Sequence, residues 1–133
     1  MSGTFGYELD PRLLKEEDKH VIRDQIEQFH KFDELIREGD YYRLDQPASN
    51  GLYTAWEFVS SDRSEALVSL VVTDVEANAA FPFVKLRGLE PEGIYHLEEM
   101  EQRFTGAALM YGGYALPQLP GDYPAVLLHF IRQ

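Results

Sequence analysis

Apolar residues recur at steps of three and four between residues 14 and 38, and this spacing predicts one long helix. Such steps place side chains on one face of a helix that turns about once per 3.6 residues. Glu16, Glu17 and Asp18 stand where the positive end of the helix dipole favours acids. Gly39 follows the last apolar residue, and we expect it to end the helix in the left-handed conformation. The apolar stripe consists of Leu14, Val21, Ile22, Ile26, Phe29, Phe32, Leu35 and Ile36.

After Gly39 the pattern changes to short extended runs between turn residues, which predicts strands and turns only. The polar residues 60–64 predict a hairpin between the second and third strands. The turn Glu90-Pro91-Glu92-Gly93 predicts a second hairpin, in which Tyr95 and Leu97 face the same side. About six strands at short spacing are typical of a small antiparallel β-sandwich. We expect strands at residues 40–44, 52–60, 65–73, 83–89, 94–98 and 125–131.

Residues 5–9 alternate between apolar and polar or glycine positions, so they are compatible with one further short strand. This segment has no hairpin partner before the helix. The start of the helix is ambiguous, because Lys15 stands where a serine or threonine cap is common, and Asp10 is the alternative cap.

The length of 133 residues corresponds to one domain, or to one domain with part of another attached. An apolar share of 44 % is ample for a core, and the formal net charge is −11. This charge disfavours binding to a phosphate backbone or to an anionic membrane surface, so we expect neither nucleic acid nor membrane as a partner.

The sequence contains no cysteine, which excludes disulfides, thiolate zinc sites and cysteine nucleophiles from it. The lack of cysteine fits a cytoplasmic protein. The chain also has no apolar run that resembles a signal peptide or that is long enough to span a membrane.

No group of polar residues has the spacing of a known catalytic or metal site. Glu98, Glu99 and Glu101 are neighbours, whereas acid–base hydrolysis needs carboxylates that flank a cleft from different elements. Gly112-Gly113 is too short for a phosphate-binding loop, and we expect no helix after it. The four histidines, which we expect at the surface or in packing contacts, are His20, His30, His96 and His129. We therefore expect no catalytic residue, no metal and no cofactor in this chain.

Aromatic residues are the remaining candidates for binding, because their rings can stack on sugars. At alternating strand positions they belong more often to cores and interfaces. The candidates are Tyr41, Tyr42, Tyr53, Trp56, Tyr111 and Tyr114.

Several stretches of the sequence are more particular than their composition. Phe-Gly-Tyr-Glu-Leu-Asp at 5–10 precedes the helix, and Gly-Asp-Tyr-Tyr-Arg-Leu at 39–44 follows it. Ala-Trp-Glu-Phe-Val-Ser-Ser-Asp-Arg-Ser-Glu-Ala-Leu-Val stands at 55–68. Leu-Arg-Gly-Leu at 86–89, Gly-Ala-Ala-Leu-Met at 106–110 and Leu-Pro-Gly-Asp-Tyr at 119–123 come later. In this order, they make nearly the whole chain resemble the C-terminal end of bacterial α-galactosidases of glycoside hydrolase family 36.

The resemblance implies a division of the chain at residue 39. Residues 1–39 would be the last strand and last helix of a (β/α)8 catalytic barrel, and residues 40–133 a C-terminal antiparallel β-sandwich domain. A whole barrel needs about 250 residues, so the chain would hold only a fragment of one. The implied fold class is mainly β, with one long helix left over from the barrel.

The resemblance also implies that the chain is not itself catalytic. Family members are retaining enzymes that use two aspartates on earlier barrel strands, and no position here matches either motif. The chain would then be the non-catalytic C-terminal domain of an enzyme acting on terminal α-galactosides such as melibiose and raffinose. The catalytic barrel of the same polypeptide would be its partner, with a homo-oligomer contact as a further role. No catalytic role passes to Asp10, Asp18, Asp24, Asp33, Asp40, Asp45, Asp62, Asp74 or Asp122.

Two other hypotheses stay open at this point. A free-standing carbohydrate-binding module would use Tyr41, Tyr42, Trp56 and Tyr114, and a protein-interaction domain would use the acidic surface. The barrel hypothesis makes one physical prediction of its own. The apolar stripe of the helix should exceed what the β-domain can cover, which leaves the surplus exposed or buried in self-association.

Overall fold

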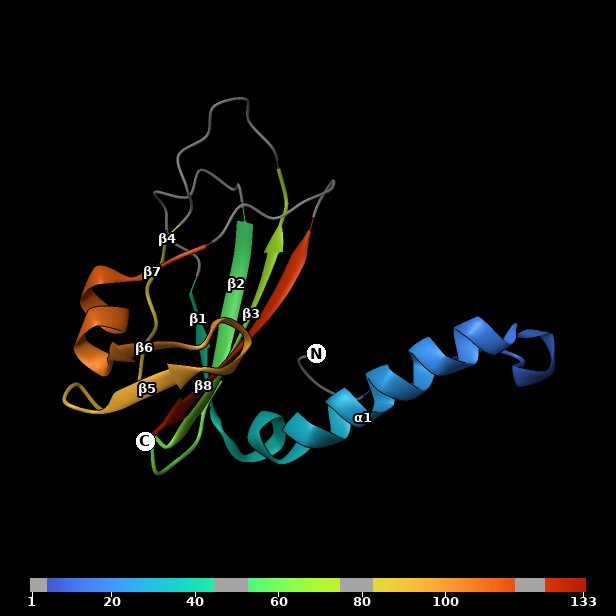
Figure 1. The fold of residues 1–133 in the computed structure, drawn as a ribbon, viewed down its shortest axis with the longest axis horizontal. Coiled ribbons are helices and arrows are strands. Elements are labelled where there is room, and N and C mark those ends of the chain that lie inside the picture. Colours follow the sequence, from blue (N-terminus) through green and yellow to red (C-terminus); the bar gives the residue numbers. More distant parts are fainter. Residues whose placement is uncertain (1–4, 45–52, 75–82, 117–123) are drawn as a thin grey trace.

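The computed structural model describes residues 5–44, 53–74, 83–116 and 124–133 and consists mainly of antiparallel strands with one long helix (Figure 1). This confirms the predicted mainly β, antiparallel fold with one long helix. Two expected loops and Asp45 and Asp122 lie outside the described residues. The elements are η1 (Pro11–Leu13), α1 (Glu16–Glu38), β1 (Asp40–Arg43), β2 (Tyr53–Val59), β3 (Glu65–Val72), β4 (Phe83–Val84), β5 (Ile94–Leu97), η3 (Glu98–Met100), β6 (Gln102–Thr105), η4 (Ala108–Gly112), β7 (Tyr114–Ala115) and β8 (Ala125–Arg132).

Six strands form one antiparallel sheet in the order β1-β2-β3-β8-β5-β6, while β4 and β7 pair separately. The first predicted hairpin is confirmed, because β2 and β3 pair from Tyr53–Val72 to Val59–Ala66. Its turn is held by the Asp62 carboxylate, which accepts hydrogen bonds from the Ser64 backbone N–H at 3.0 Å and from the Ser60 hydroxyl at 2.8 Å.

The second predicted hairpin is wrong. β5 pairs with β6 and β8, and β4 pairs with β7 and covers only Phe83–Val84 of the expected strand. Residues 85–89 lie across the sheet instead, where Leu86 and Leu89 are buried. The Leu86 N–H donates to the Leu109 carbonyl at 3.2 Å, so this segment forms its backbone bonds outside a ladder. The expectation that Tyr95 and Leu97 share a buried face is confirmed.

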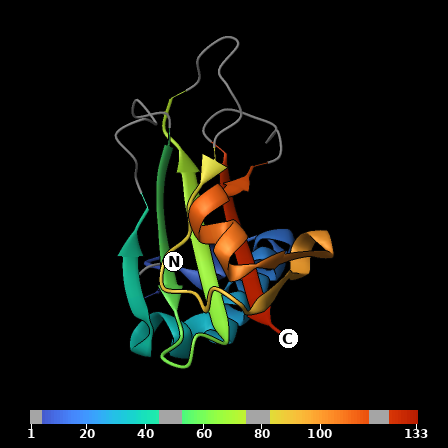
Figure 2. The same ribbon diagram turned by 90° about the vertical axis from the view of Figure 1, so that its left-hand side faces the viewer.

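The sheet separates two groups of buried apolar residues. Figure 2 shows η4 on one side of the sheet and α1 on the other. One face carries Ala55, Val68 and Leu70 under a cover that includes β4, β7 and η4. The other face carries Phe58 and Leu67 under the C-terminal end of α1. Because both faces are covered, β3 is buried at five consecutive positions.

Helix α1 has nearly the predicted bounds, but both of its ends differ in detail from expectation. Asp10 accepts the Arg12 N–H and caps the 3-10 turn η1, and Lys15 precedes α1 without a side-chain cap. Gly39 is extended, with φ of −76°, and is therefore not left-handed. A Cβ there would lie 3.0 Å from the Val59 carbonyl oxygen and closer still to that of Leu35. Close backbone approach, as the chain turns directly into β1, thus accounts for the glycine.

The described part of the N-terminal segment, from residue 5 onward, forms no strand, because it has no neighbouring strand to pair with. The segment returns along α1, and the Phe5 ring stacks on Phe29 with centroids 5.0 Å apart. The Tyr7 hydroxyl donates to the Gln25 side chain. Segment and helix together form an arm that projects away from the sheet (Figure 1).

Two helical turns interrupt the region that was expected to contain strands and turns only. η3 follows β5 directly and ends at Glu101, which is left-handed with φ of 52°. The π-helical turn η4 buries Leu109, and the Thr105 hydroxyl accepts the Ala108 N–H at its start, at 3.1 Å. As expected, no helix follows Gly113 in the described part of the chain.

Candidate functional site

A group of connected charged side chains surrounds His129 on β8. This ring is 2 % exposed and lies on the face of the sheet that α1 covers, beside Phe32, with ring centroids 4.9 Å apart. Its Nε2 is 2.6 Å from the Glu65 carboxylate and its Nδ1 is 2.8 Å from that of Glu98. Lys31 of α1 forms an ion pair with Glu98 at 2.9 Å. His129 is therefore in a packing contact, one of the two placements expected for the histidines, and its two glutamate partners were not foreseen.

Glu98, Glu99 and Glu101 are all exposed, but the first two also contact neighbouring elements. Lys31 and His129 both donate to Glu98, and these hydrogen bonds lower the pKa of its carboxyl. Glu99 accepts the His129 backbone N–H at 3.2 Å. Glu101 lies 3.2 Å from His96. The glutamates thus join η3 to β8 and α1, and they do not flank a cleft.

Glu57 is the second buried polar residue, and it lies on the opposite face of the sheet. Its side chain is fully buried and accepts the Arg87 backbone N–H, while its second oxygen has no partner among the described residues. Burial raises the pKa of this carboxyl to about 8, because the surrounding apolar residues disfavour the charged form. The alternation Tyr53, Ala55, Glu57, Val59 is the sequence signal that could have placed Glu57 in the core.

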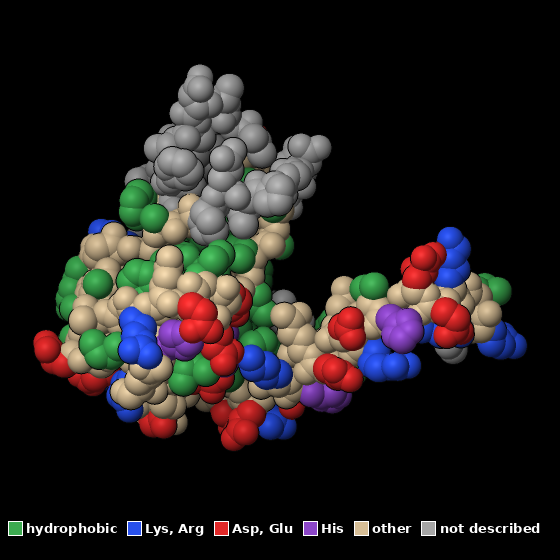
Figure 3. Space-filling model, viewed as in Figure 1, with side chains coloured by type: hydrophobic (Ala, Val, Ile, Leu, Met, Phe, Trp, Pro, Cys, Tyr) green, Lys and Arg blue, Asp and Glu red, His purple; other side chains and the backbone are tan. Residues whose placement is uncertain are grey.

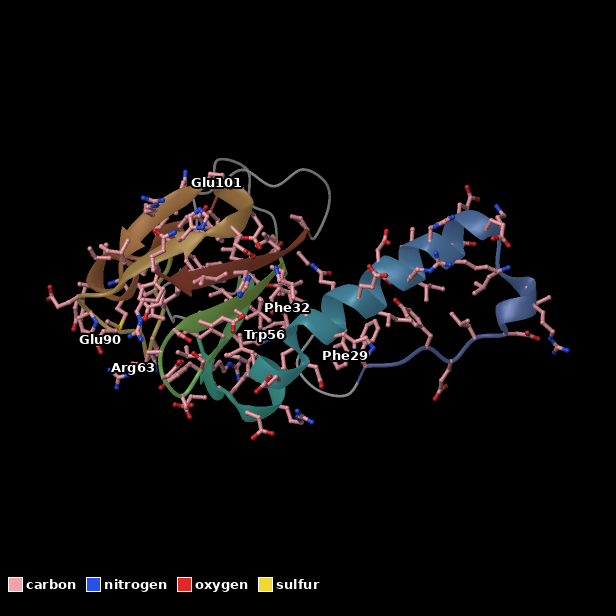
Figure 4. The ribbon with its side chains drawn as sticks, turned by 60° about the horizontal axis from the view of Figure 1, so that its bottom comes forward. Phe29, Phe32, Trp56, Arg63, Glu90 and Glu101 are labelled. Atoms are coloured by element: carbon pink, nitrogen blue, oxygen red, sulfur yellow. The ribbon has the colours of Figure 1, made fainter. Side chains whose placement is uncertain are left out.

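The aromatic candidates for sugar binding do not form a platform among the described residues. Tyr53 is buried and donates to the Phe83 carbonyl at 2.9 Å, and Tyr42 covers Gly88. Tyr114 packs edge-on against Phe130 in the core. Trp56 joins the apolar residues between α1 and the sheet (Figure 4).

Two tyrosines of that set are exposed, and they come from distant parts of the fold. Tyr41 is 56 % exposed on β1, at one edge of the sheet. Tyr111 is 71 % exposed on η4, which packs beside β6 at the other edge. Their separation leaves no pair of exposed rings that could hold one sugar between them.

The other candidate residues lie apart from one another. His20 and His30 are exposed on α1. Among the described residues, no three histidines, aspartates or glutamates are placed to hold a metal ion. No helix of the described structure is long and apolar enough to cross a membrane.

The apolar stripe of α1 is buried only where the helix meets the sheet. Phe32, Leu35 and Ile36 are buried, whereas Val21 is 54 % exposed and Ile26 is 37 % exposed. The N-terminal half of the helix stands clear of the β-domain (Figure 3). The prediction that the stripe exceeds what the β-domain covers is therefore confirmed.

Comparison with known proteins shows the family to which the chain belongs. Residues 53–130 match the sequence model of the glycosyl hydrolase family 36 C-terminal domain. The chain belongs to this family. Its identity is 45 % over 130 residues to the bifunctional alpha-galactosidase/sucrose kinase AgaSK of Mediterraneibacter gnavus, covering 98 % of this chain and 14 % of that protein. The chain is also 39 % identical over 127 residues to alpha-galactosidase AgaA of Geobacillus stearothermophilus. This match covers 96 % of this chain and 17 % of that protein.

Solved family 36 structures have the same fold. The galactosidase domain of AgaSK superimposes with a TM-score of 0.87 at 43 % identity, over 97 % of this chain and 18 % of that one. The alpha-galactosidase AgaB of Geobacillus stearothermophilus gives a TM-score of 0.89 at 39 % identity. The match covers 99 % of this chain and 18 % of that one. The chain thus corresponds to a small part of much longer relatives, and the match includes α1 as well as the β-domain. Membership in this family argues against an interaction domain unrelated to carbohydrate enzymes.

Proposed function

We propose that the chain is the non-catalytic C-terminal part of an α-galactosidase, and that it supports the catalytic barrel of the same polypeptide. Residues 1–39 contribute the end of the barrel, and residues 40–133 form the β-domain beside it. The relatives named above are alpha-galactosidases, which supports a parent enzyme that acts on terminal α-galactosides such as melibiose and raffinose. The cytoplasmic location predicted from the cysteine-free sequence belongs to the same proposal.

The observation that carries this proposal is the unequal burial of α1. A helix of 23 residues is about 35 Å long, and its buried residues Phe32, Leu35 and Ile36 all lie in the last two turns. Farther toward the N-terminus, the exposed Val21 and Ile26 continue the same stripe. An apolar stripe of this kind is a surface that another body covers. The barrel is the preferred occupant, because the family relatives extend well beyond this chain and contain its helix.

The role proposed for the chain excludes turnover by the chain alone. A chromogenic α-galactoside and melibiose should both remain unhydrolysed at high protein concentration, because no residue here matches the family's catalytic aspartates. Hydrolysis that a point substitution in this chain abolishes would overturn the proposal.

The docking surface is tested separately by sedimentation of the isolated chain over a range of concentrations. We expect self-association, because the exposed stripe lacks its barrel, and we expect Ile26→Glu to reduce it. His20→Glu is the matched control, since His20 is exposed, lies about 120° around the helix from Ile26, and also receives a glutamate. A chain that stays monomeric at every concentration, with Val21 and Ile26 protected from solvent, would contradict the assignment of this face.

A homo-oligomer contact through the same stripe is the other occupant that the sequence allows. The barrel and a second copy are distinguished as occupants of the stripe in the full-length enzyme, where the barrel is present. There, Ile26→Glu should lower the stability of the enzyme without changing its oligomeric state if the barrel covers the stripe. A change of oligomeric state with unchanged stability would assign the stripe to a second copy.

A further inference from the structure

The two ring nitrogens of His129 both face carboxylate oxygens, and neither contact is longer than an ordinary hydrogen bond. The distances are 2.6 Å from Nε2 to Glu65 and 2.8 Å from Nδ1 to Glu98. An ionised carboxylate only accepts hydrogen bonds, and a neutral imidazole has one N–H donor and one bare acceptor nitrogen. A neutral ring between two ionised glutamates would therefore place two acceptors against each other at one of these contacts.

We infer that His129 is held as an imidazolium between Glu65 and Glu98, and that this charged centre is a proton-sensitive joint between α1 and the sheet. With a proton on each nitrogen, both contacts become charge-assisted hydrogen bonds. Loss of one proton converts one of them into a repulsive contact between an oxygen and a nitrogen lone pair, at a position that is 2 % exposed.

The charges around the ring favour this assignment. Lys31 approaches from α1, Glu65 from β3, and Glu98 and Glu99 from η3. His96 of β5 pairs with Ile131 of the same strand as His129, but its ring contacts Glu101. Three carboxylates thus face one ammonium group near the ring, so the cluster has an excess of negative charge that an imidazolium offsets. Burial of the ring acts against its charge, but Glu65 and Glu98 are each more than a third exposed and retain part of their hydration.

The same cluster contains the polar contacts that hold α1 to the sheet. Lys31 of the helix binds Glu98, which in turn binds His129. The next helix residue, Phe32, packs edge-on against the His129 ring. The backbone of β8 also binds η3, since the Glu99 carboxylate accepts the His129 N–H. A change in the proton count of the ring therefore acts on the position of η3 and, through Lys31 and Phe32, on the end of α1.

The protonation of the ring is tested directly by nitrogen NMR of the isolated chain. At about pH 6.5, near the ordinary midpoint of histidine, both ring nitrogens of His129 should resonate as N–H and couple to their protons. His20, which is exposed on α1, is the internal control. One bare nitrogen on His129 at this pH would overturn the inference, because a protonated glutamate would then satisfy the second contact.

The joint itself is tested by measuring the distance between spin labels at Gln28→Cys on α1 and Ser61→Cys in the β2–β3 turn. The chain has no cysteine, so both labels are unique, and both positions are exposed. We expect one narrow distance distribution at about pH 5.5 and loss of the narrow peak at about pH 9, where imidazole is neutral. An unchanged distribution at both pH values would overturn the joint.

Two variants separate the ring from other effects of pH. In Glu98→Gln the amide can donate to a bare Nδ1, so the narrow peak should persist at both pH values. Lys31→Met removes the ion pair but leaves both ring contacts, so it should keep the pH response. Both are measured in a Glu57→Gln background, which removes the other buried group that titrates in this range. A Glu98→Gln chain that loses its narrow peak in parallel with the parent would also overturn the inference.

Discussion

Glu57 should make the folded chain less stable as the pH rises, and Glu57→Gln should remove that dependence. The carboxyl is fully buried among apolar residues, accepts the Arg87 backbone N–H through one oxygen, and has a folded-state pKa of about 8 against an ordinary value of 4.5. Between these two values the unfolded chain has released the proton that the folded chain retains. Stability is therefore complete below about pH 4.5, falls as the pH rises, and levels off above about pH 8.

The magnitude follows from the same two pKa values. Each pH unit between them costs about 1.4 kcal/mol, so the full loss is about 5 kcal/mol and most of it has occurred by pH 7. Glutamine has nearly the same shape and keeps an oxygen for the Arg87 N–H. Its amide group, however, is a buried donor without a partner, which costs about 1–3 kcal/mol at every pH. We therefore expect the variant to be less stable than the parent at pH 5 and more stable above pH 8.

The assay is urea unfolding at a series of pH values, followed by fluorescence of Trp56, which is the sole tryptophan of the chain. The informative quantity is the difference in free energy of unfolding between Glu57→Gln and the parent, because contributions of the other titrating groups cancel in it. This difference should rise by about 5 kcal/mol from acid to pH 8. Glu92→Gln, at an exposed position, should give a flat difference. A flat curve for Glu57→Gln as well would refute the reasoning.

Three further predictions concern the helix end, the first hairpin and sugar binding. Gly39→Ala should destabilise the chain by more than about 1 kcal/mol in urea unfolding, a typical cost of overpacking, because the added Cβ would press on two backbone carbonyls. Gly6→Ala is the control and should be close to neutral, because open space surrounds Gly6. Hydrogen bonds from Ser64 and Ser60 lower the pKa of Asp62 to about 2. The amide chemical shifts of the 60–64 turn should therefore hold steady down to about pH 4 and change only as the carboxyl is protonated near pH 2. A change in the Ser64 amide shift centred at pH 4 would contradict those bonds. An NMR titration with galactose and melibiose should leave the shifts of Tyr41 and Tyr111 unchanged, since the exposed rings are far apart in the fold, whereas localised shifts at either one would support a carbohydrate-binding module.

Local periodicity predicted the elements whose neighbours are adjacent in sequence. The helix, the β2–β3 hairpin and the last strand follow from apolar spacing alone, because each pattern is long enough to distinguish a period of 3.6 from a period of 2. The stretch around Val84 and Leu86 shows why the same method failed at the second hairpin. Its alternating apolar and basic residues read as a strand, yet the apolar ones face a core that includes Leu109 and Tyr114, which are distant in sequence. Nothing local distinguishes a strand from an extended segment that crosses a sheet.

The polar partners of the candidate residues were hidden for a related reason. Glu65, Glu98 and His129 come from three elements, and only the sheet order places β8 between β3 and β5. The alternation along β8 does show which face of the sheet each side chain occupies. Leu127 and His129 are two residues apart, so the histidine lies on the side that the helix covers. A histidine in an apolar strand register therefore signals a buried polar contact. Its partners can be named only once the strand order is known.

The two halves of helix α1 differ in what covers them. The last two turns of α1 are packed by the β-domain through Phe32, Leu35 and Ile36, while the earlier turns carry an apolar stripe that this domain leaves open. A helix that belonged to the β-domain alone would have a polar surface at Val21 and Ile26, and one that belonged to the barrel alone would not carry Lys31 into an ion pair with Glu98. The β-domain therefore covers the helix only from about Phe29 onward, and the earlier turns are left to the proposed barrel. The His129 cluster contacts the helix at Lys31 and Phe32, in the first turn that packs on the β-domain.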